Sequence, residues 1–141
     1  MIILDSNVLM YSTHLDFPRH QTAKTYIEQQ LQNGESIGLP WVSLLAFIRL
    51  STNLKTLKIC LLPRQALDRV DVWLKHPNVS TPEPGKYHFE IMQSLILADN
   101  QAANLTNDAH LAAIAIERNA TMVSFDQDFA RFSGLKLHIP K

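Results

Sequence analysis

Short apolar runs alternate with longer helical patterns along the whole chain, and this alternation restricts the fold more than any other feature. Five runs predict strands, at residues 2–4, 35–39, 79–81, 121–124 and about 136–139. Helical patterns separate them, at about residues 5–11, 19–32, 41–51, 63–76 and 87–98, and from residue 108 onward. Strands that alternate with helices favour a parallel sheet covered by helices on both faces. We therefore predict an α/β fold with three layers, α/β/α, around a central parallel sheet of about five strands.

Two of the helical patterns also predict how their helices pack. The helix at residues 41–51 is apolar nearly all round, which predicts a central position. The helix that begins at Pro63 carries Leu67, Val70 and Leu74 along its predicted buried face. A polar loop at residues 99–107 is expected before the alanine-rich helix that opens at Asp108.

Composition limits the class of protein and its partners. The length of 141 residues fits one domain, residues 1–141, and 46% hydrophobic with 18% charged residues is typical of a globular chain. The formal net charge is zero, so nucleic acid would have to be bound through a local basic rim or a metal ion. The alternative is a protein with no polyanionic partner. On charge alone, the candidates for a basic rim are Lys24, Arg49, Lys55, Lys58 and Arg131.

Cysteine usage and the apolar runs indicate a cellular location. Cys60 is the only cysteine, which excludes an internal disulfide and suits a reducing cytosol. Its apolar surroundings predict that it is a small buried residue. The first residues lack the basic region of a signal peptide, and no run approaches the roughly 20 apolar residues that cross a bilayer. We expect a cytoplasmic protein with no membrane partner.

Three aspartates stand where predicted strands or loops pass into helices. Asp5 follows the first strand, Asp126 follows the fourth, and Asp108 opens the alanine-rich helix. An aspartate in such a place most often caps a helix, and that interpretation stays open for each one alone. Caps have no need to cluster, whereas ligands of parallel sheets gather at the carboxyl ends of the strands. Because Mg²⁺ and Mn²⁺ prefer carboxylate oxygens, the three acids together indicate metal-assisted hydrolysis.

Three short segments, in this order along the chain, carry a resemblance to a known family. Residues 3–9 read Ile-Leu-Asp-Ser-Asn-Val-Leu, residues 107–113 read Asn-Asp-Ala-His-Leu-Ala-Ala, and residues 124–129 read Ser-Phe-Asp-Gln-Asp-Phe. They resemble the opening, central and closing motifs of PIN domains, in particular the VapC type, which is the toxin half of a toxin–antitoxin pair. The resemblance covers essentially the whole chain and implies a PIN-like version of the predicted fold.

The resemblance implies a role for each matching residue. Asp5, Asp108 and Asp126 match acids that hold one or two Mg²⁺ or Mn²⁺ ions in PIN ribonucleases. Asp128 matches an acid of the closing motif that supports the metal through water. The alternative for Asp128 is an acid at a helix N-terminus, favoured there by the helix dipole.

Asn7 and Ser124 match small polar residues that orient the acids, and local capping of backbone groups is their alternative. His110 follows Asp108 by two residues, and positions i and i+2 of a helix face different ways, so we interpret it as structural. The other histidines form no metal-ligand spacing.

One position departs from the family pattern. PIN domains usually carry a glutamate on the helix after the second strand, and Ala46 stands where it is expected. Either Ala46 belongs to a branch with a site of three or four aspartates, or it silences the nuclease. Arg49, on the same helix, pairs with an acid or contacts a phosphate in one interpretation, and is a structural or exposed residue in the other.

Two functions follow as hypotheses. The first is a metal-dependent endoribonuclease, the toxin of a toxin–antitoxin pair, which cuts single-stranded or looped RNA. The resemblance implies a cognate antitoxin protein as partner and a homodimer as assembly. The second is a PIN fold without catalysis, acting as a binding or regulatory module, which Ala46 favours. A receiver domain and a phosphatase with an aspartate nucleophile are disfavoured, because the sequence lacks an acid after a middle strand and has Asn7 two residues after Asp5.

Overall fold

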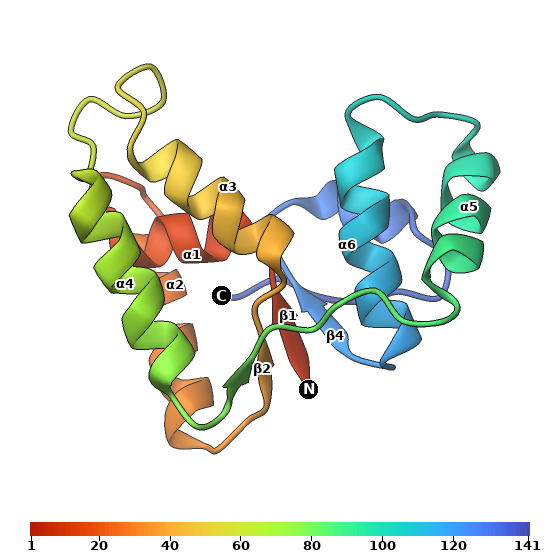
Figure 1. The fold of residues 1–141 in the computed structure, drawn as a ribbon, viewed down its shortest axis with the longest axis horizontal. Helices are drawn as coiled ribbons and strands as arrows, with labels where there is room; N and C mark the ends of the chain where they lie inside the picture. The colour runs from red at the N-terminus through yellow and green to blue at the C-terminus, as the bar shows by residue number, and fades with distance from the viewer.

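A five-stranded parallel sheet forms the centre of the computed structural model, which describes residues 1–141 (Figure 1). The strand order is β3-β2-β1-β4-β5, and every neighbouring pair is parallel. The elements along the chain are β1 (Ile2–Leu4), α1 (Ser6–Thr13), α2 (His20–Gln32), β2 (Ile37–Gly38), α3 (Trp41–Ser51), α4 (Pro63–Lys75), β3 (Val79–Ser80), α5 (His88–Asp99), α6 (Leu105–Glu117), β4 (Thr121–Val123), the 3₁₀ helix η1 (Gln127–Arg131) and β5 (Lys136–His138). The predicted α/β architecture with its five-stranded parallel sheet is confirmed.

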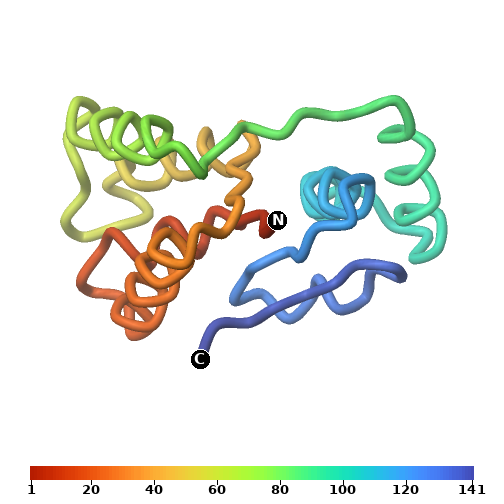
Figure 2. The backbone as a smooth tube through the Cα atoms, turned by 90° about the horizontal axis from the view of Figure 1, so that it is seen from below, coloured from red at the N-terminus to blue at the C-terminus, as the bar shows by residue number.

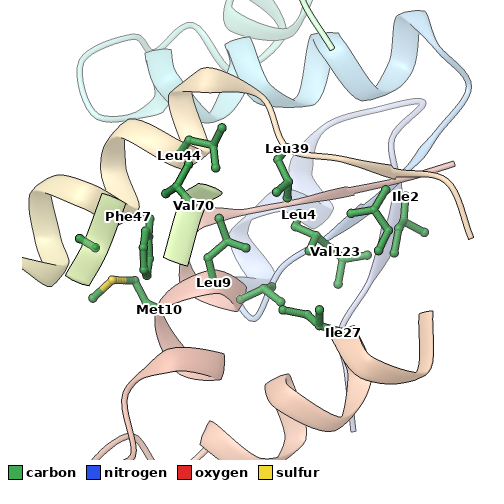
Figure 3. Close-up of a cluster of buried hydrophobic side chains, with 13 residues drawn as sticks. Ile2, Leu4, Leu9, Met10, Ile27, Leu39, Leu44, Phe47, Val70 and Val123 are labelled. Carbon is green, nitrogen blue, oxygen red and sulfur yellow. The ribbon is translucent and has the colours of Figure 1, made fainter. Parts of the chain in front are cut away.

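Helices cover both faces of the sheet, and alternate residues of β1 contact opposite layers. Helices α1 to α4 lie on one side, and α5 and α6 lie on the other (Figure 1). Successive side chains of a strand point to opposite faces. Ile2 and Leu4 accordingly join the core under α1 to α4, while Ile3 joins the core under α5 and α6. The larger side chains of the first core, Leu44 and Phe47 of α3 among them, are drawn in Figure 3.

A long crossover links the two layers. It leaves β3, passes the sheet in an extended conformation and enters α5 on the opposite side (Figure 2). This connection brings α5 and α6 to the face that α1 to α4 leave open. None of the helices is long and apolar enough to span a bilayer.

Helix α6 begins three residues before the predicted start. Leu105, Thr106 and Asn107 are helical, and the Leu105 N–H donates to the carbonyl of Ala102 at 2.9 Å. Asp108 therefore lies in the first turn of α6 and is not its cap. The sequence pattern was misread there because buried Leu105 belongs to the apolar face of the helix, whereas its neighbours are polar.

Two packing predictions were wrong in part. Helix α3 is not buried all round, since Trp41 and Leu45 are 45% and 58% exposed. On α4 the buried positions are Ala66 and Val70, which are four residues apart, while Leu67 is 49% exposed. Alanine is small enough to allow close helix approach, so the helix turns Ala66 and not Leu67 toward the core. Cys60 is only partly buried.

Candidate active site at the carboxyl edge of the sheet

Asp5 is held at the end of the central strand by a short hydrogen bond to each of its carboxylate oxygens. One carboxylate oxygen, Oδ1, accepts from the backbone N–H of Ser6 at 2.7 Å and caps helix α1. The other, Oδ2, accepts from the Ser124 hydroxyl at 2.7 Å. Capping and site formation are therefore compatible, because the two oxygens serve different partners.

Ser124 connects the first and fourth strands at this edge. Its side chain is fully buried, and its Oγ donates to Asp5 and accepts from the Asn7 side-chain amide at 3.0 Å. The same Oγ lies 3.0 Å from the donating backbone N–H of Asp126. Asn7 in turn accepts from the N–H of Phe125 at 3.2 Å through its Oδ1. The network joins residues about 120 positions apart and leaves the Asp5 carboxylate little rotational freedom.

Asp126 and Asp128 lie at the start of η1. The Asp126 Oδ1 accepts from the backbone N–H of Asp128 at 2.8 Å, so Asp126 caps this short helix. The Asp128 side chain is exposed and lines a cleft that it shares with Asp108 and Arg131. The cap interpretation holds for Asp5 and Asp126, and it fails for Asp108.

Asp108 is the acid whose protonation is most perturbed. Its pKa is raised to about 6, mainly by partial burial and further by the negative charges of Asp5, Asp126 and Asp128, while the positive charge of Arg131 opposes the rise. Burial also raises the pKa of Asp5, against the hydrogen bonds from Ser124 and Ser6 that lower it. Side chains from β1, α6 and the β4–η1 segment thus act on one another at one edge of the sheet.

Two clefts meet at Asp108. The first, which we call the α3 cleft, has a volume of about 310 Å³. It is lined by Asp5, Ser6, Val42, Ser43, Leu45, Ala46, Arg49, Leu50, Asn107, Asp108 and Leu111. The second, which we call the η1 cleft, has a volume of about 420 Å³. It is lined by Gln101, Ala102, Ala103, Asn104, Leu105, Asp108, Asp128 and Arg131.

The α3 cleft contains the position that departs from the family pattern. Ala46 lines it together with Asp5 and Asp108, so a longer side chain at this position would project into the cleft that the two acids line. Arg49 is exposed and lines the same cleft, with no ion pair to either acid. Ser43 is 2% exposed and also lines it, and its hydroxyl has no hydrogen-bond partner. Sequence reasoning missed Ser43, although a serine in an otherwise apolar helix was a usable signal.

The carboxylate oxygens of the acids fit a hard divalent cation, but the side chains lie too far apart in this structure to bind one ion together. Carboxylate oxygens are the ligands such cations prefer. The charges of Asp5, Asp126 and Asp128 add to the effect of burial in raising the pKa of Asp108, and a cation would compensate these charges. No three His, Cys, Asp or Glu side chains are arranged closely enough to form a metal-holding group. The acids would have to draw together to share one ion.

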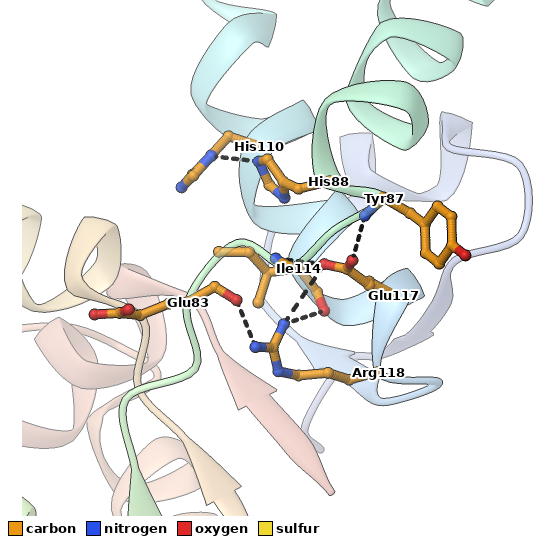
Figure 4. Close-up of polar contacts among 8 residues, drawn as sticks. Glu83, Tyr87, His88, His110, Ile114, Glu117 and Arg118 are labelled. Atoms are coloured by element: carbon orange, nitrogen blue, oxygen red, sulfur yellow. Dashed lines mark hydrogen bonds and ion pairs between the residues drawn. The ribbon is translucent and has the colours of Figure 1, made fainter.

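The structure separates the predicted basic residues. Arg49 and Arg131 line the two clefts beside Asp108. Lys24 lines a different hollow between α2 and α4, and Lys55 and Lys58 line neither of the two clefts. His110 forms a hydrogen bond of 2.9 Å with His88 (Figure 4), which agrees with a structural role.

Comparison with known proteins gives one family. The PIN-domain model matches residues 2–135. Ribonuclease VapC37 of Mycobacterium tuberculosis is 37% identical, with 99% of this chain and 97% of that protein covered. Ribonuclease VapC43 of the same organism is 35% identical, with 99% and 95% covered.

Solved structures agree with the fold. A chain of the VapBC2 complex of Rickettsia felis, bound to a DNA fragment from its promoter, matches with a TM-score of 0.73 and 20% identity over 100% of both chains. VapC20 of Mycobacterium tuberculosis, described as a toxin that cleaves the sarcin–ricin loop, matches with a TM-score of 0.66 and 16% identity over 96% and 99% of the two chains. At these identities the structures support the fold alone.

Proposed function

The chain belongs to the PIN-domain family, and we propose that it is an endoribonuclease, the toxin component of a toxin–antitoxin pair. The observation that carries the proposal is the gathering of acids around Asp108, whose pKa is raised to about 6 by burial and by the charges of Asp5, Asp126 and Asp128. Relatives named as ribonucleases, 30–37% identical over nearly the whole chain, support the same conclusion.

We further propose that the reaction depends on Mg²⁺ or Mn²⁺. Asp5, Asp108 and Asp126 would hold the ion, with Asp128 acting through water. Such an ion, when bound, lowers the pKa of a water ligand and offsets charge on the scissile phosphate. The acids bind and orient, and none of them attacks phosphorus. Ser124 fixes the Asp5 carboxylate in place through its hydroxyl.

Residues of this chain would also position the RNA. The α3 cleft offers the exposed guanidinium of Arg49, a group suited to a phosphate, beside Asp5 and Asp108. Because the chain carries no net charge, such local contacts would have to replace a general positive field. Single-stranded or looped RNA fits best, since paired RNA hides the edges of its bases.

The proposal extends to a partner and an assembly. Neighbouring structures are described as VapBC complexes, so we propose that a cognate antitoxin binds and inhibits this chain. We also propose a homodimer and a single domain over residues 1–141. A cytoplasmic location follows from the proposed function, because the RNA and the antitoxin would be made there.

A second candidate is a PIN fold that binds without cutting. Ala46 favours it, because it lines the α3 cleft where the family pattern has a glutamate. If a carboxylate is missing at that point, Ala46→Glu should tighten Mn²⁺ binding. Equal or weaker binding in that variant would show that position 46 does not face the metal site.

Two measurements on the same samples separate the candidates. Mn²⁺ binding is measured by calorimetry, and cleavage of mixed single-stranded RNA is followed on gels, for the wild type and Asp5→Asn. A ribonuclease should bind the ion and cut, and Asp5→Asn should lose both. Binding without cutting would favour the second candidate. Asp68→Asn is the matched control, because Asp68 is exposed on α4 and its only ion pair is a long one of 3.8 Å to Arg64.

A further inference from the structure

The η1 cleft opens directly beside the acids and is lined by two primary amides. Gln101 and Asn104 come from the connection between α5 and α6, and Asp108, Asp128 and Arg131 complete the polar lining. Its volume of about 420 Å³ is in the range of pockets that bind small organic groups. Because Asp108 lines this cleft as well as the α3 cleft, a group bound here would be next to the bond that is cut.

Asn104 occupies the position that usually caps a helix, yet it does not cap α6. Asparagine is among the best N-cap residues because its side-chain oxygen accepts a backbone N–H. Here the Asn104 backbone is already helical, at φ −63° and ψ −22°, and the side chain makes no capping bond. Its carbonyl and NH₂ groups are therefore both available. Gln101 is exposed at the same cleft, and its side chain likewise makes no hydrogen bond within the chain.

The connection that carries these amides is anchored at its α5 end. Arg131 pairs with Asp99 at 3.4 Å, and the Gln101 N–H donates to the carbonyl of Ile96 at 3.3 Å. Ala103 has a φ of +51°, a left-handed conformation that is uncommon for residues other than glycine and asparagine. The chain turns sharply between the two amides, which places both of them on the cleft wall.

The charges of the lining favour a neutral group over a phosphate. The η1 cleft contains two carboxylates, Asp108 and Asp128, and one guanidinium, Arg131, which already has Asp99 as a partner. A second phosphate would find no unpaired side-chain cation in this cleft. A nucleobase is neutral, and its edge presents hydrogen-bond donors and acceptors side by side. A primary amide presents the same pair of groups and can match a base edge with two bonds.

We propose that Gln101 and Asn104 read a base next to the cut phosphodiester bond and so determine sequence preference. This inference rests on the proposed ribonuclease function and adds the part of the substrate that the η1 cleft recognises. Single-stranded RNA can turn an unstacked base into such a cleft, where its pairing edge is accessible. The α3 cleft, with Arg49, would hold the strand on the other side of the acids.

The test compares cleavage preference, not cleavage rate. The wild type, Gln101→Ala, Asn104→Ala and the double variant cut a short single-stranded RNA library with a randomised centre, and the new ends are sequenced. We expect the double variant to lose about tenfold or more of the preference at one position beside the cut, while it still cuts the pool. Gln93→Ala on α5 and Asn33→Ala after α2 are matched controls, because they remove exposed amides that line neither cleft.

A binding measurement keeps this inference separate from the ribonuclease proposal. Fluorescence anisotropy with EDTA compares the affinities of single-base oligoribonucleotides, oligo-A, oligo-C and oligo-U, for each protein. The wild type should discriminate among them, and the double variant should not. An unchanged preference in the double variant, in either assay, would overturn the role of Gln101 and Asn104 even if RNA is cut. Absence of cleavage by the wild type would instead refute the ribonuclease proposal. Cutting of the randomised library by the wild type with no base preference beside the cut would overturn this inference.

Discussion

The two ends of helix α6 each carry one carboxylate, and the two side chains meet opposite electrostatic environments. Asp108, in the first turn, receives no hydrogen bond, and burial together with three neighbouring acids raises its pKa to about 6. Glu117, the last residue, is 12% exposed and accepts the backbone N–H groups of Gly85 at 2.8 Å and Tyr87 at 2.9 Å (Figure 4). Burial raises the Glu117 pKa, but these bonds and the Arg118 charge outweigh it, so its pKa is lowered.

This difference runs against the helix dipole. An acid is favoured at a helix N-terminus and disfavoured at a C-terminus, by about 0.3–1 kcal/mol. Hydrogen bonds to a charged group contribute about 1.5–3 kcal/mol each. Specific partners therefore decide which end is satisfied, and the dipole is the smaller effect. The unsatisfied end of α6 lies at the proposed active site, whereas the satisfied end holds the long crossover in place.

The satisfied end holds the long crossover against α6. Arg118 donates to the carbonyls of Glu83 and Ile114, so this arginine and Glu117 together bind the crossover on both sides of Gly85. A Cβ at Gly85 would lie 2.5 Å from the Glu117 Oε2. Only glycine allows the carboxylate to approach this backbone so closely.

The largest expected effect is on cleavage, and it separates the two carboxylates by function. Asp108→Asn should reduce RNA cleavage about 100-fold or more, because a metal-assisted reaction loses several kcal/mol of charge stabilisation with a ligand. Glu117→Gln should leave cleavage per folded molecule unchanged. Rates are measured on one RNA at matched folded concentration. A comparable loss of cleavage in Asp108→Asn and Glu117→Gln would show that the two ends of α6 do not differ in function.

The next effect is on stability, and it tests the crossover contact. Glu117→Ala should lower the free energy of unfolding by about 1–3 kcal/mol, because two N–H groups lose their acceptor. Gly85→Ala should lower the free energy of unfolding by a similar amount, because the new Cβ would displace the flexible Glu117 carboxylate from its bonds to Gly85 and Tyr87. Urea unfolding of both variants and of the double variant measures this.

The double variant supplies the control. Substitutions of two residues that share one interaction do not have additive effects on stability. The double variant Gly85→Ala with Glu117→Ala should therefore lose little more free energy of unfolding than either single variant. Additive costs would mean that Gly85 and Glu117 stabilise the protein independently.

A smaller effect is the pH dependence of stability, which has opposite signs at the two ends. The Asp108 pKa is raised from 3.8 to about 6, so without divalent ions its ionisation costs stability as pH rises through this window. Asp108→Asn should remove that decline. The Glu117 pKa is lowered from 4.5, so its stabilisation is present above that value and is lost as pH falls through the lower folded value.

The free energies of unfolding of the wild type, Asp108→Asn and Glu117→Gln, measured across the acidic pH range, test both pH dependences. If the unfolding free energy of the wild type rises between pH 4 and pH 6 relative to that of Asp108→Asn, ionised Asp108 does not destabilise the fold, and the raised pKa is contradicted.

The smallest expected effect is that of Ser43, which we compare with Ser124, a second buried serine at the acid edge. The Ser43 hydroxyl has no partner, so Ser43→Ala should leave the melting temperature unchanged or raise it slightly. Ser124→Ala should lower it, because Ser124 bonds to Asp5, Asn7 and Asp126. Thermal unfolding of the two variants tests whether the unsatisfied groups of this edge are dispensable for stability.

Much of the fold was predictable because periodicity is a local property. Residues 2–4 and 121–124 read as strands, and the structure has β1 at Ile2–Leu4 and β4 at Thr121–Val123. The placement of Asp5 and Asp126 after these strands was equally local. The errors arose where tertiary packing decides, as at Leu67, which is exposed because α4 turns Ala66 inward.

By itself, the sequence determined that the chain alternates strands and helices and that Asp5 and Asp126 follow strands. Only the tertiary structure decided that β4 pairs with β1, which lets the Ser124 hydroxyl reach Asp5 across 119 positions. It also decided that α6 lies where Asp108 faces other acids while Glu117 meets the crossover. The physical reason is that periodicity depends on neighbouring residues, whereas the partner of a charge depends on the path of the whole chain.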